Sequence, residues 1–192
     1  MNDYVEELRM CVIVPSYNNQ KSNRYIWNIE SLLQQDYHNY RVVIIDDHSS
    51  DQTLPLTADY LNWRRAAPEK YILVSSHVRR TALENIYYGA HRYCGYGEVL
   101  MVVDGDDELI GTQVFRVMNA IYQQSHAYAL YSNFMQDGTP IRNPLTLGIS
   151  EDYPSFVKRQ SGYRWFKHSY SQLRTMLSDL FLLQRKESLS GA

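Results

Sequence analysis

Short apolar runs alternate with amphipathic stretches over the first 134 residues of the chain. Four runs are nearly continuous in Val, Ile, Leu and Met, which is typical of parallel strands buried on both faces. They lie at residues 10–14, 41–45, 71–74 and 98–103. Helices are expected after them, at residues 23–35, 52–61, 80–93 and 114–121, and a fifth strand at 127–134. This alternation predicts an α/β fold with a mostly parallel sheet flanked by helices.

The pattern changes after Phe134. Residues 135–162 contain three Gly and three Pro and show little periodicity, which predicts a long irregular connection. Apolar residues return at helical spacing over 170–183, where we expect a helix. From Tyr153 to the end, seven Lys or Arg stand against two acids, so the irregular, partly helical C-terminal segment is basic.

The composition is that of one globular domain, with 192 residues, 44% hydrophobic and 21% charged. A net charge of −2 argues against a nucleic-acid partner, which would need a strongly basic face. No apolar run approaches the roughly 18 to 20 residues of a membrane span, and the N-terminus lacks the apolar stretch of a signal peptide. Cys11 and Cys94 stand in apolar surroundings, so we expect no disulfide framework and a cytoplasmic location.

Polar residues collect where the predicted strands end. Residues 16–19 follow the first strand, Asp46 and Asp47 the second, and residues 104–107 the fourth. In an open parallel sheet, ligands bind beyond the carboxyl ends of the strands. With the strand order 3-2-1-4, the two acidic tips lie about 10 Å apart, at roughly 4.8 Å per strand, which leaves space for one nucleotide.

The segment 104–107 (DGDD) holds three carboxylates within four residues. Such groups repel one another unless a cation or solvent compensates them. Mg²⁺ and Mn²⁺ take oxygen ligands, commonly one or two carboxylates together with substrate phosphates and water. Taken alone, the segment is equally compatible with a solvated acidic turn at the start of the next helix. Its place at a strand end, opposite a second pair of acids, favours the metal.

Other residues near the strand ends fit a nucleotide. Asp46 and Asp47 exceed what a turn or a helix cap requires, and they can accept hydrogen bonds from a base N–H or a ribose hydroxyl. Tyr17 is placed to stack on a planar base, with an ordinary packed tyrosine as an equal alternative. Arg80, next to Arg79, can approach phosphates or form part of a solvated pair.

Three segments, in order, resemble motifs of one family: 12–19 (VIVPSYNN), 31–53 (SLLQQDYHNYRVVIIDDHSSDQT) and 97–109 (GEVLMVVDGDDEL). Together they resemble the nucleotide-sugar-binding half of family 2 glycosyltransferases, which have the GT-A fold, a Rossmann-like α/β architecture. The resemblance implies a nucleotide-sugar-binding half over 1–134. It implies an acceptor-side loop and a C-terminal helix over 135–192 in the same domain, with truncation of the chain as one interpretation of its early end.

The resemblance also implies roles for individual residues. It places the nucleotide against Pro15, Tyr17, Asp47 and Asp104. The polar residues Asn18, Asp46 and Arg80 complete the expected nucleotide-binding set. The resemblance places Mn²⁺ or Mg²⁺ on Asp104, Asp106 and Asp107. Family members generally invert the anomeric centre with the help of a carboxylate base. Asp152 is the candidate for that base, with a solvated loop residue or a base beyond the chain as alternatives. His48 stands where the family has Gly, and His tolerates the left-handed backbone of such a turn better than most residues.

These features predict a metal-dependent inverting glycosyltransferase that moves a sugar from a nucleotide-diphosphate sugar, with a UDP-sugar favoured, to an acceptor hydroxyl. One alternative is a nucleotide-sugar-binding module without transfer activity. Another is a nucleotidyltransferase, which should have a Gly-rich phosphate loop that residues 16–21 lack. Dinucleotide-binding, P-loop and zinc signatures are absent from the sequence. Whether the acceptor is a glycan, a protein or a lipid-linked group stays open, as does membership of a larger polypeptide or complex.

Overall fold

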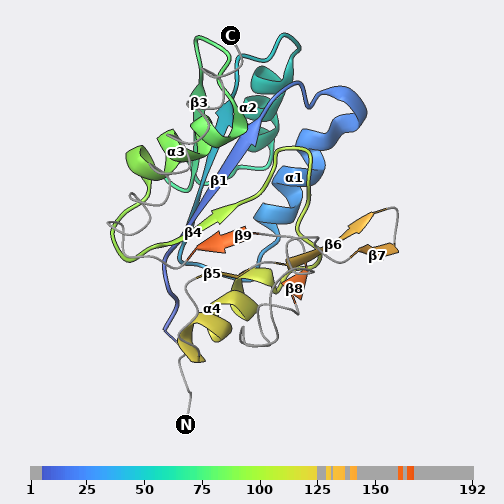
Figure 1. The fold of residues 1–192 in the computed structure, drawn as a ribbon. Coiled ribbons are helices and arrows are strands. Elements are labelled where there is room, and N and C mark those ends of the chain that lie inside the picture. The colour runs from blue at the N-terminus through green and yellow to red at the C-terminus, as the bar shows by residue number, and fades with distance from the viewer. Residues whose placement is uncertain are drawn as a thin grey trace, which may run out of the picture.

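The computed structural model describes residues 6–124, 129–130, 132–136, 139–141, 160–161 and 164–166 (Figure 1). Its centre is a six-stranded sheet in the order β3-β2-β1-β4-β9-β5. The strands are β1 (Met10–Ser16), β2 (Tyr40–Asp46), β3 (Tyr71–Ser75), β4 (Val99–Val102), β5 (Ala129–Leu130) and β9 (Arg164–Phe166). The first four run parallel, which confirms the predicted order 3-2-1-4. β9 runs antiparallel to both of its neighbours.

Helices cover both faces of this sheet, as expected. They are the 3-10 helix η1 (Lys21–Asn23) and the α-helices α1 (Arg24–Leu33), α2 (Thr53–Trp63), α3 (Ala82–Tyr93) and α4 (Val114–Gln124). Alternate residues of β1 point to opposite faces. Val12 and Val14 pack in a core with α1, α2 and α4, whereas Cys11 and Ile13 face α3 (Figure 1). None of the described helices has the length and apolarity to cross a membrane.

Helix α3 packs closely on β1 and β2. A Cβ atom on Gly89 would lie 2.8 Å from Ile45 Cδ1 and 3.0 Å from Ile13 Cδ1, so glycine allows this close approach. At the end of the helix, Cys94 is disulfide-bonded to Cys11, with the two Cα atoms 5.6 Å apart. The expectation of no disulfide is therefore wrong, because the fold brings together two cysteines that lie 83 residues apart in the sequence.

The predicted fifth strand at 127–134 is divided between two sheets. β5 joins the main sheet, whereas β6 (Ser132–Gln136) forms a three-stranded sheet, in the order β7-β6-β8, with β7 (Thr139–Ile141) and β8 (Gln160–Ser161). The prediction missed this division because β5 pairs with β9, a strand from much later in the chain. The predicted helix at 170–183 lies outside the described residues. The division into 1–134 and 135–192 stays a prediction, and β9 places part of the second segment in the sheet of the first.

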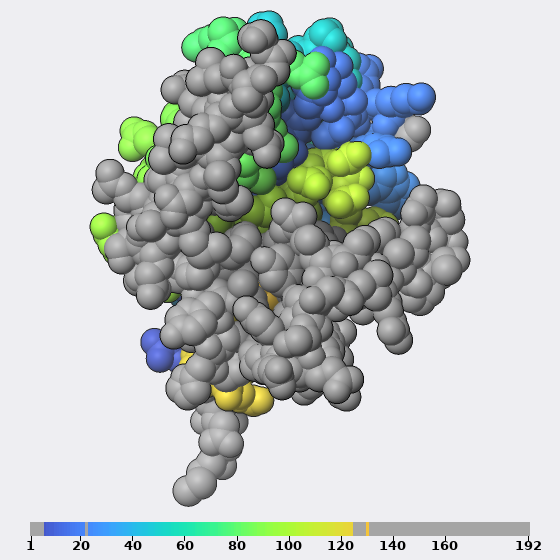
Figure 2. Space-filling view, in the orientation of Figure 1, coloured from blue at the N-terminus to red at the C-terminus, as the bar shows by residue number. Residues whose placement is uncertain are grey.

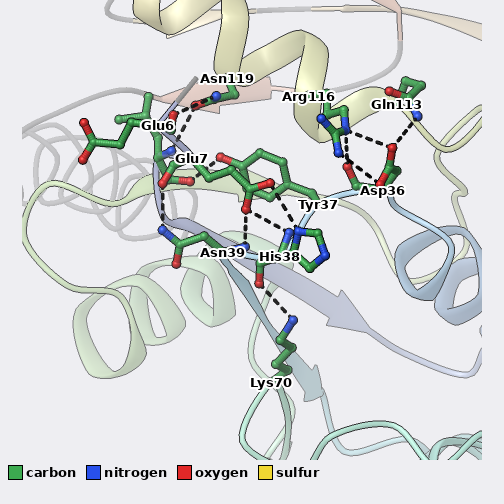
Figure 3. Close-up of polar contacts among 11 residues, drawn as sticks. Glu6, Glu7, Asp36, Tyr37, His38, Asn39, Lys70, Gln113, Arg116 and Asn119 are labelled. Carbon is green, nitrogen blue, oxygen red and sulfur yellow. Dashed lines mark hydrogen bonds and ion pairs between the residues drawn. The ribbon is translucent and has the colours of Figure 1, made fainter. Parts of the chain in front are cut away.

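A polar network ties the amino-terminal end of the sheet together (Figure 3). The backbone N–H groups of His38 and Asn39 donate to Glu7 Oε2 at 3.0 and 2.9 Å. On the α4 side, Arg116 Nε lies 3.0 Å from Asp36 Oδ2. The network therefore joins the segment before β1, the loop before β2 and helix α4, at the end of the sheet opposite the carboxyl ends of the strands.

This network predicts a pH-dependent contribution to stability from Asp36. Hydrogen bonds from Arg116 and then Gln113 lower the pKa of Asp36 below its ordinary value of 3.8. A lowered carboxyl pKa stabilises the fold above the ordinary pKa, and the effect is lost as the pH falls through the lowered value. We expect Asp36→Asn to unfold at lower urea concentration than the wild type at pH 7, and the difference to shrink at pH 3. Asp59→Asn, at an exposed position of α2, is the control. A difference that is equal at both pH values would contradict the prediction.

Candidate functional site

A cleft of about 410 Å³ lies at the carboxyl ends of β1, β2 and β4, beside the start of α3. This volume falls in the range of small-molecule sites. The cleft is lined by Pro15, Ser16, Tyr17, Asn19, Asp47, Arg79, Arg80, Thr81, Ala82, Asn85, Asp104 and Asp106. In Figure 2 the surface of the segment after β4 (yellow-green) adjoins the surface of the segment after β1 (blue).

The strand register holds two acidic segments, which follow β2 and β4, and the polar segment after β1 at one edge of the sheet. Ser16 is paired with Asp46 at the last position of the β1–β2 ladder. One residue further on, the Asp47 N–H donates to the Ser16 carbonyl at 2.8 Å. On the other side of β1, the Gly105 N–H donates to the Pro15 carbonyl at 2.9 Å. The backbone therefore keeps the segments after β2 and β4 on either side of β1.

Helix α1 shapes the segment 104–107 through Asn28. The buried Asn28 amide donates to the carbonyl oxygens of Asp104 and Asp107, at 3.0 and 2.8 Å. The segment also closes on itself, because the Asp107 N–H donates to the Asp104 carbonyl at 2.9 Å. With its backbone held in this way, the turn places the Asp104 and Asp106 residues on the wall of the cleft.

The carboxylates of this turn affect one another electrostatically. The Arg24 guanidinium of α1 pairs with Asp106, with Nη1 and Oδ2 2.9 Å apart. Desolvation, followed by the charges of Asp106 and Asp104, raises the pKa of Asp107 above its ordinary value. An exposed arginine thus stands where a cation is favoured. The turn offers only oxygen ligands, its carboxylates repel one another, and Arg24 already places a positive charge beside them. These three features fit a site for Mn²⁺ or Mg²⁺.

The opposite side of the cleft combines a buried acid with cationic and aromatic side chains. Asp47 is buried, and its Oδ1 accepts the Arg80 backbone N–H at 2.7 Å. The Arg79 guanidinium carbon lies 3.7 Å from the centroid of the Tyr17 ring. A planar ligand stacked on that face of Tyr17 would take the place of Arg79. This side of the cleft can therefore accept hydrogen bonds and stack on flat groups.

The first turn of α3 forms a third wall. Thr81 caps the helix, and its Oγ1 accepts the Glu84 N–H at 3.2 Å. Thr81 and Ala82 both line the cleft. The N–H groups of a helix N-terminus, with the helix dipole, favour anions such as phosphate. A ligand that carries both a flat ring and phosphates thus matches the chemistry of the walls.

The structure brings together six of the sequence-predicted site residues, which all line the cleft: Pro15, Tyr17, Asp47, Arg80, Asp104 and Asp106. Asn18, Asp46 and Asp107 are not among the lining residues. The buried Asp46 carboxylate instead accepts the backbone N–H and hydroxyl of Ser49, at 3.0 and 2.5 Å. His48 has φ 59°, the left-handed conformation expected there. The candidate base Asp152 lies outside the described residues.

Sequence reasoning missed five residues that shape the site. Asn28 lies on the apolar face of α1, and a polar side chain at such a position could have indicated a buried hydrogen-bonding role. Thr81 and Glu84 have the spacing of a capping box, which marks the start of a helix. Arg24 meets Asp106 across 82 residues of sequence, and no local pattern announces that contact. The fifth is Asn85, which lines the cleft from α3.

A second group of metal-ligating atoms lies away from the cleft. Among the described residues, the sulfurs of Cys11 and Cys94 and a carboxylate oxygen of Glu98 lie within 4.8 Å of one another. The sulfurs are bonded to each other, and Glu98 forms ion pairs with Arg9 and Arg41. These ligands are therefore already engaged, and the group is not a metal centre in this form of the chain.

The position of Gly105 predicts that the cleft is sensitive to a single methyl group. A Cβ atom there would lie 2.7 Å from Asn19 Nδ2, 2.9 Å from Ser16 Cβ and 3.0 Å from the Pro15 carbonyl oxygen. We expect Gly105→Ala to displace the turn and to lower the free energy of unfolding by about 1–3 kcal/mol. Denaturant titration measures the loss. Gly95→Ala is the matched control, since its Cβ would come no closer than 3.4 Å to Glu98; equal effects of the two changes would refute the argument.

The fold is similar to those of solved glycosyltransferases. A crystal structure of S. aureus TarS, residues 1–349, superposes with a TM-score of 0.63 at 21% identity, covering 83% of this chain and 47% of that one. The mannosyltransferase PcManGT from Pyrobaculum calidifontis, in complex with GDP-Man and Mn²⁺, gives a TM-score of 0.57 at 20% identity, covering 84% and 45%. The chain thus spans about half the length of these structures. At this identity the likeness shows the GT-A fold.

The family is shown by the sequence itself. A comparison with curated proteins gives no match. Residues 11–182, however, match the family described as glycosyl transferase family 2, and this range includes all of β1 except Met10, the residues that line the cleft, and β9. The chain therefore belongs to glycosyl transferase family 2.

Proposed function

We propose that the chain is a metal-dependent, inverting glycosyltransferase that transfers a sugar from a nucleotide-diphosphate sugar, with a UDP-sugar favoured, to an acceptor hydroxyl. One observation carries the proposal: Asp47, Asp104 and Asp106 line the same cleft as the N-terminus of α3. Family membership supports it. Further support comes from two structural neighbours, TarS in complex with UDP-GlcNAc and PcManGT in complex with GDP-Man and Mn²⁺.

The walls of the cleft suggest how the donor is oriented. The base lies on the β2 side, where Tyr17 offers a ring and Asp47 a buried acceptor. The diphosphate lies between the N-terminus of α3 and the segment 104–107. The helix end favours phosphate oxygens, and Arg80 brings a further positive charge to the same wall.

The donor set of the turn suits a divalent cation. Asp104 and Asp106 would hold Mn²⁺ or Mg²⁺, with Asp107 in support. Arg24 would have to release Asp106, because a carboxylate oxygen that accepts a hydrogen bond from the guanidinium is a poorer metal ligand. When bound, the ion supplies positive charge that stabilises the departing nucleoside diphosphate.

Transfer with inversion needs one further group. The acceptor oxygen forms a bond to the anomeric carbon from the face opposite the diphosphate, while the bond from that carbon to the diphosphate oxygen breaks. A carboxylate base takes the hydroxyl proton, and the products are the glycoside and a nucleoside diphosphate. Asp152 is the proposed base. A binding module without this step would have the same cleft, and a transfer assay separates the two.

We also propose a cytoplasmic location, which requires that the disulfide be reduced there. Cytoplasmic thiols are generally kept reduced. A protein working there would therefore carry Cys11 and Cys94 as free thiols, whereas the bonded pair fits an oxidising compartment.

The function is tested by calorimetric titration of the chain with UDP in the presence of Mn²⁺. We expect binding that is abolished by a chelator and weakened at least about tenfold in Asp106→Asn, because the variant loses a charged metal ligand. Asp59→Asn is the control for the same chemical change outside the cleft. If the wild type binds no nucleoside diphosphate with Mn²⁺, the proposed function is wrong.

Arg24→Gln is the informative counterpart of Asp106→Asn. It removes the competing cation and keeps every carboxylate of the turn. We expect its affinity for Mn²⁺ alone, measured by electron paramagnetic resonance without nucleotide, to rise by about twofold to fivefold. An affinity that falls instead would show that Asp106 is not where the ion binds.

A further inference from the structure

The disulfide between Cys11 and Cys94 joins the centre of the sheet to the end of α3. Cys11 lies within β1 and is 0% exposed, whereas Cys94 follows the last residue of α3 and is partly buried. The next three residues, 95–97, are exposed. A crosslink that only holds a core together needs no more than apolar neighbours. This disulfide also has ionised side chains beside it, which can influence the chemistry of its sulfur atoms.

One carboxylate and two guanidinium groups form these charged surroundings. A carboxylate oxygen of Glu98 and the sulfurs of Cys11 and Cys94 lie within 4.8 Å of one another. Glu98 forms ion pairs with Arg9, whose Nε lies 3.1 Å from Oε1, and with Arg41. Two cations therefore stand against one anion, so this group of side chains carries a net positive charge. Such surroundings favour a thiolate over a thiol.

Arg41 is the cation best placed to act on the sulfur of Cys11. The two residues are register partners in the β1–β2 ladder, so their side chains point to the same face of the sheet. Arg41 Nη1 donates to the carbonyl of Tyr93, the residue before Cys94, at 3.0 Å. Arg41 Nε is buried and has no hydrogen-bond partner within the described part of the chain. A thiolate at Cys11 would supply an acceptor for this donor.

We propose that Cys94 is a thiol-exchange site, at which a small thiol opens the disulfide while Arg41 stabilises the departing Cys11 thiolate. The attacking thiolate forms a bond to Cys94 Sγ as the bond between the two protein sulfurs breaks, and the electron pair of the broken bond leaves on Cys11. Attack occurs at Cys94 because Cys11 has no exposed surface.

A second molecule of the small thiol completes the reduction. Its thiolate attacks the mixed disulfide and releases Cys94 as a thiolate. The two protein thiolates take up the two protons that the small thiols lost. The products are two protein thiols and the disulfide of the small thiol, and the same steps in reverse restore the bond between Cys11 and Cys94.

The exchange site lies on the helix that forms one wall of the cleft. The first turn of α3, with Thr81 and Ala82, lines the cleft, and Gly89 packs the middle of the helix on β1 and β2. The disulfide ties the far end of α3 to β1. A bond that closes so long a loop of chain stabilises the fold, so its reduction loosens α3. The redox state of the two cysteines therefore sets how firmly this wall is held, whatever ligand the cleft binds.

The test is incubation of the folded full chain with reduced glutathione, followed by acid quenching, labelling of free thiols and mass spectrometry. We expect both cysteines to be reduced without denaturant, and glutathione disulfide to restore the bond. Samples taken early in the reaction should carry glutathione on Cys94 and none on Cys11. The reduced form should melt about 5 to 15 °C lower than the oxidised form. Its amide hydrogen exchange should rise more in α3 than in α1, which packs on the opposite face of the sheet.

Two variants of Arg41 separate its chemical effect from a structural one. Arg41→Gln removes the cation and leaves Glu98 paired with Arg9. We expect glutathione to reduce this variant about threefold to tenfold more slowly than the wild type. Arg41→Lys retains the charge and should react within about threefold of the wild type. A residue that only stabilised the fold would give the opposite result, because a loosened helix exposes its sulfur sooner.

Cys94→Ser is the control, since it cannot form the bond, and its melting temperature should not respond to glutathione. Four outcomes overturn the inference: no reduction of the wild type without denaturant, glutathione on Cys11 in place of Cys94, a reduction of Arg41→Gln at least as fast as that of the wild type, or equal hydrogen exchange of α3 in the two redox forms. None of these bears on the proposed function, because no nucleotide takes part in the test.

Discussion

The parallel register of β1 between β2 and β4 is the constraint on which the site depends. Ladder pairing ends with Ser16 opposite Asp46, and the backbone of Gly105 then bonds to Pro15 on the other edge of β1. These backbone hydrogen bonds hold the acidic segments on either side of β1. Side chains that are nearly 60 residues apart, such as Asp47 and Asp104, therefore line one cleft. The buried apolar strands thus hold together carboxylates that repel one another.

The accumulated negative charge explains the arrangement around the cleft. Arg24 offsets part of it in this structure, and the amide of Asn28 holds the turn in place through its carbonyl oxygens. The opposite wall supplies what an anionic ligand needs, a capped helix N-terminus beside two arginines. The cleft therefore combines an acidic side suited to a cation with a side suited to phosphate, and an occupant that supplies both satisfies each of them.

Much of the fold was predictable because it follows from periodicity. The continuous apolar runs of β1 and β2 and the amphipathic helices α1 and α4 are local signals, and all of them appear in the structure. The division of the predicted fifth strand and the insertion of β9 were not predictable, because they depend on pairing between distant segments of the chain. The disulfide between Cys11 and Cys94 was missed for the same reason.

The residues of the candidate site also fall into two groups, those that a local motif marks and those that only the folded structure identifies. Pro15, Tyr17 and the acids at the strand ends could be found because a short motif marks them. The sequence could not show that Asp46 and Asp47 have different roles. Only the turn geometry shows that Asp46 accepts hydrogen bonds from Ser49, whereas Asp47 lines the cleft. Asn85 carries no motif at all; its burial in the wall of the cleft is a property of the packed helix.

A crystal structure of the chain with UDP and Mn²⁺ tests the central claim most directly. The account predicts the ion between the diphosphate and the carboxylates of Asp104 and Asp106, with Arg24 no longer paired with Asp106 and the base beside Asp47. A nucleotide bound elsewhere, or bound in this cleft with the Arg24–Asp106 pair intact and no ion on the turn, would contradict it.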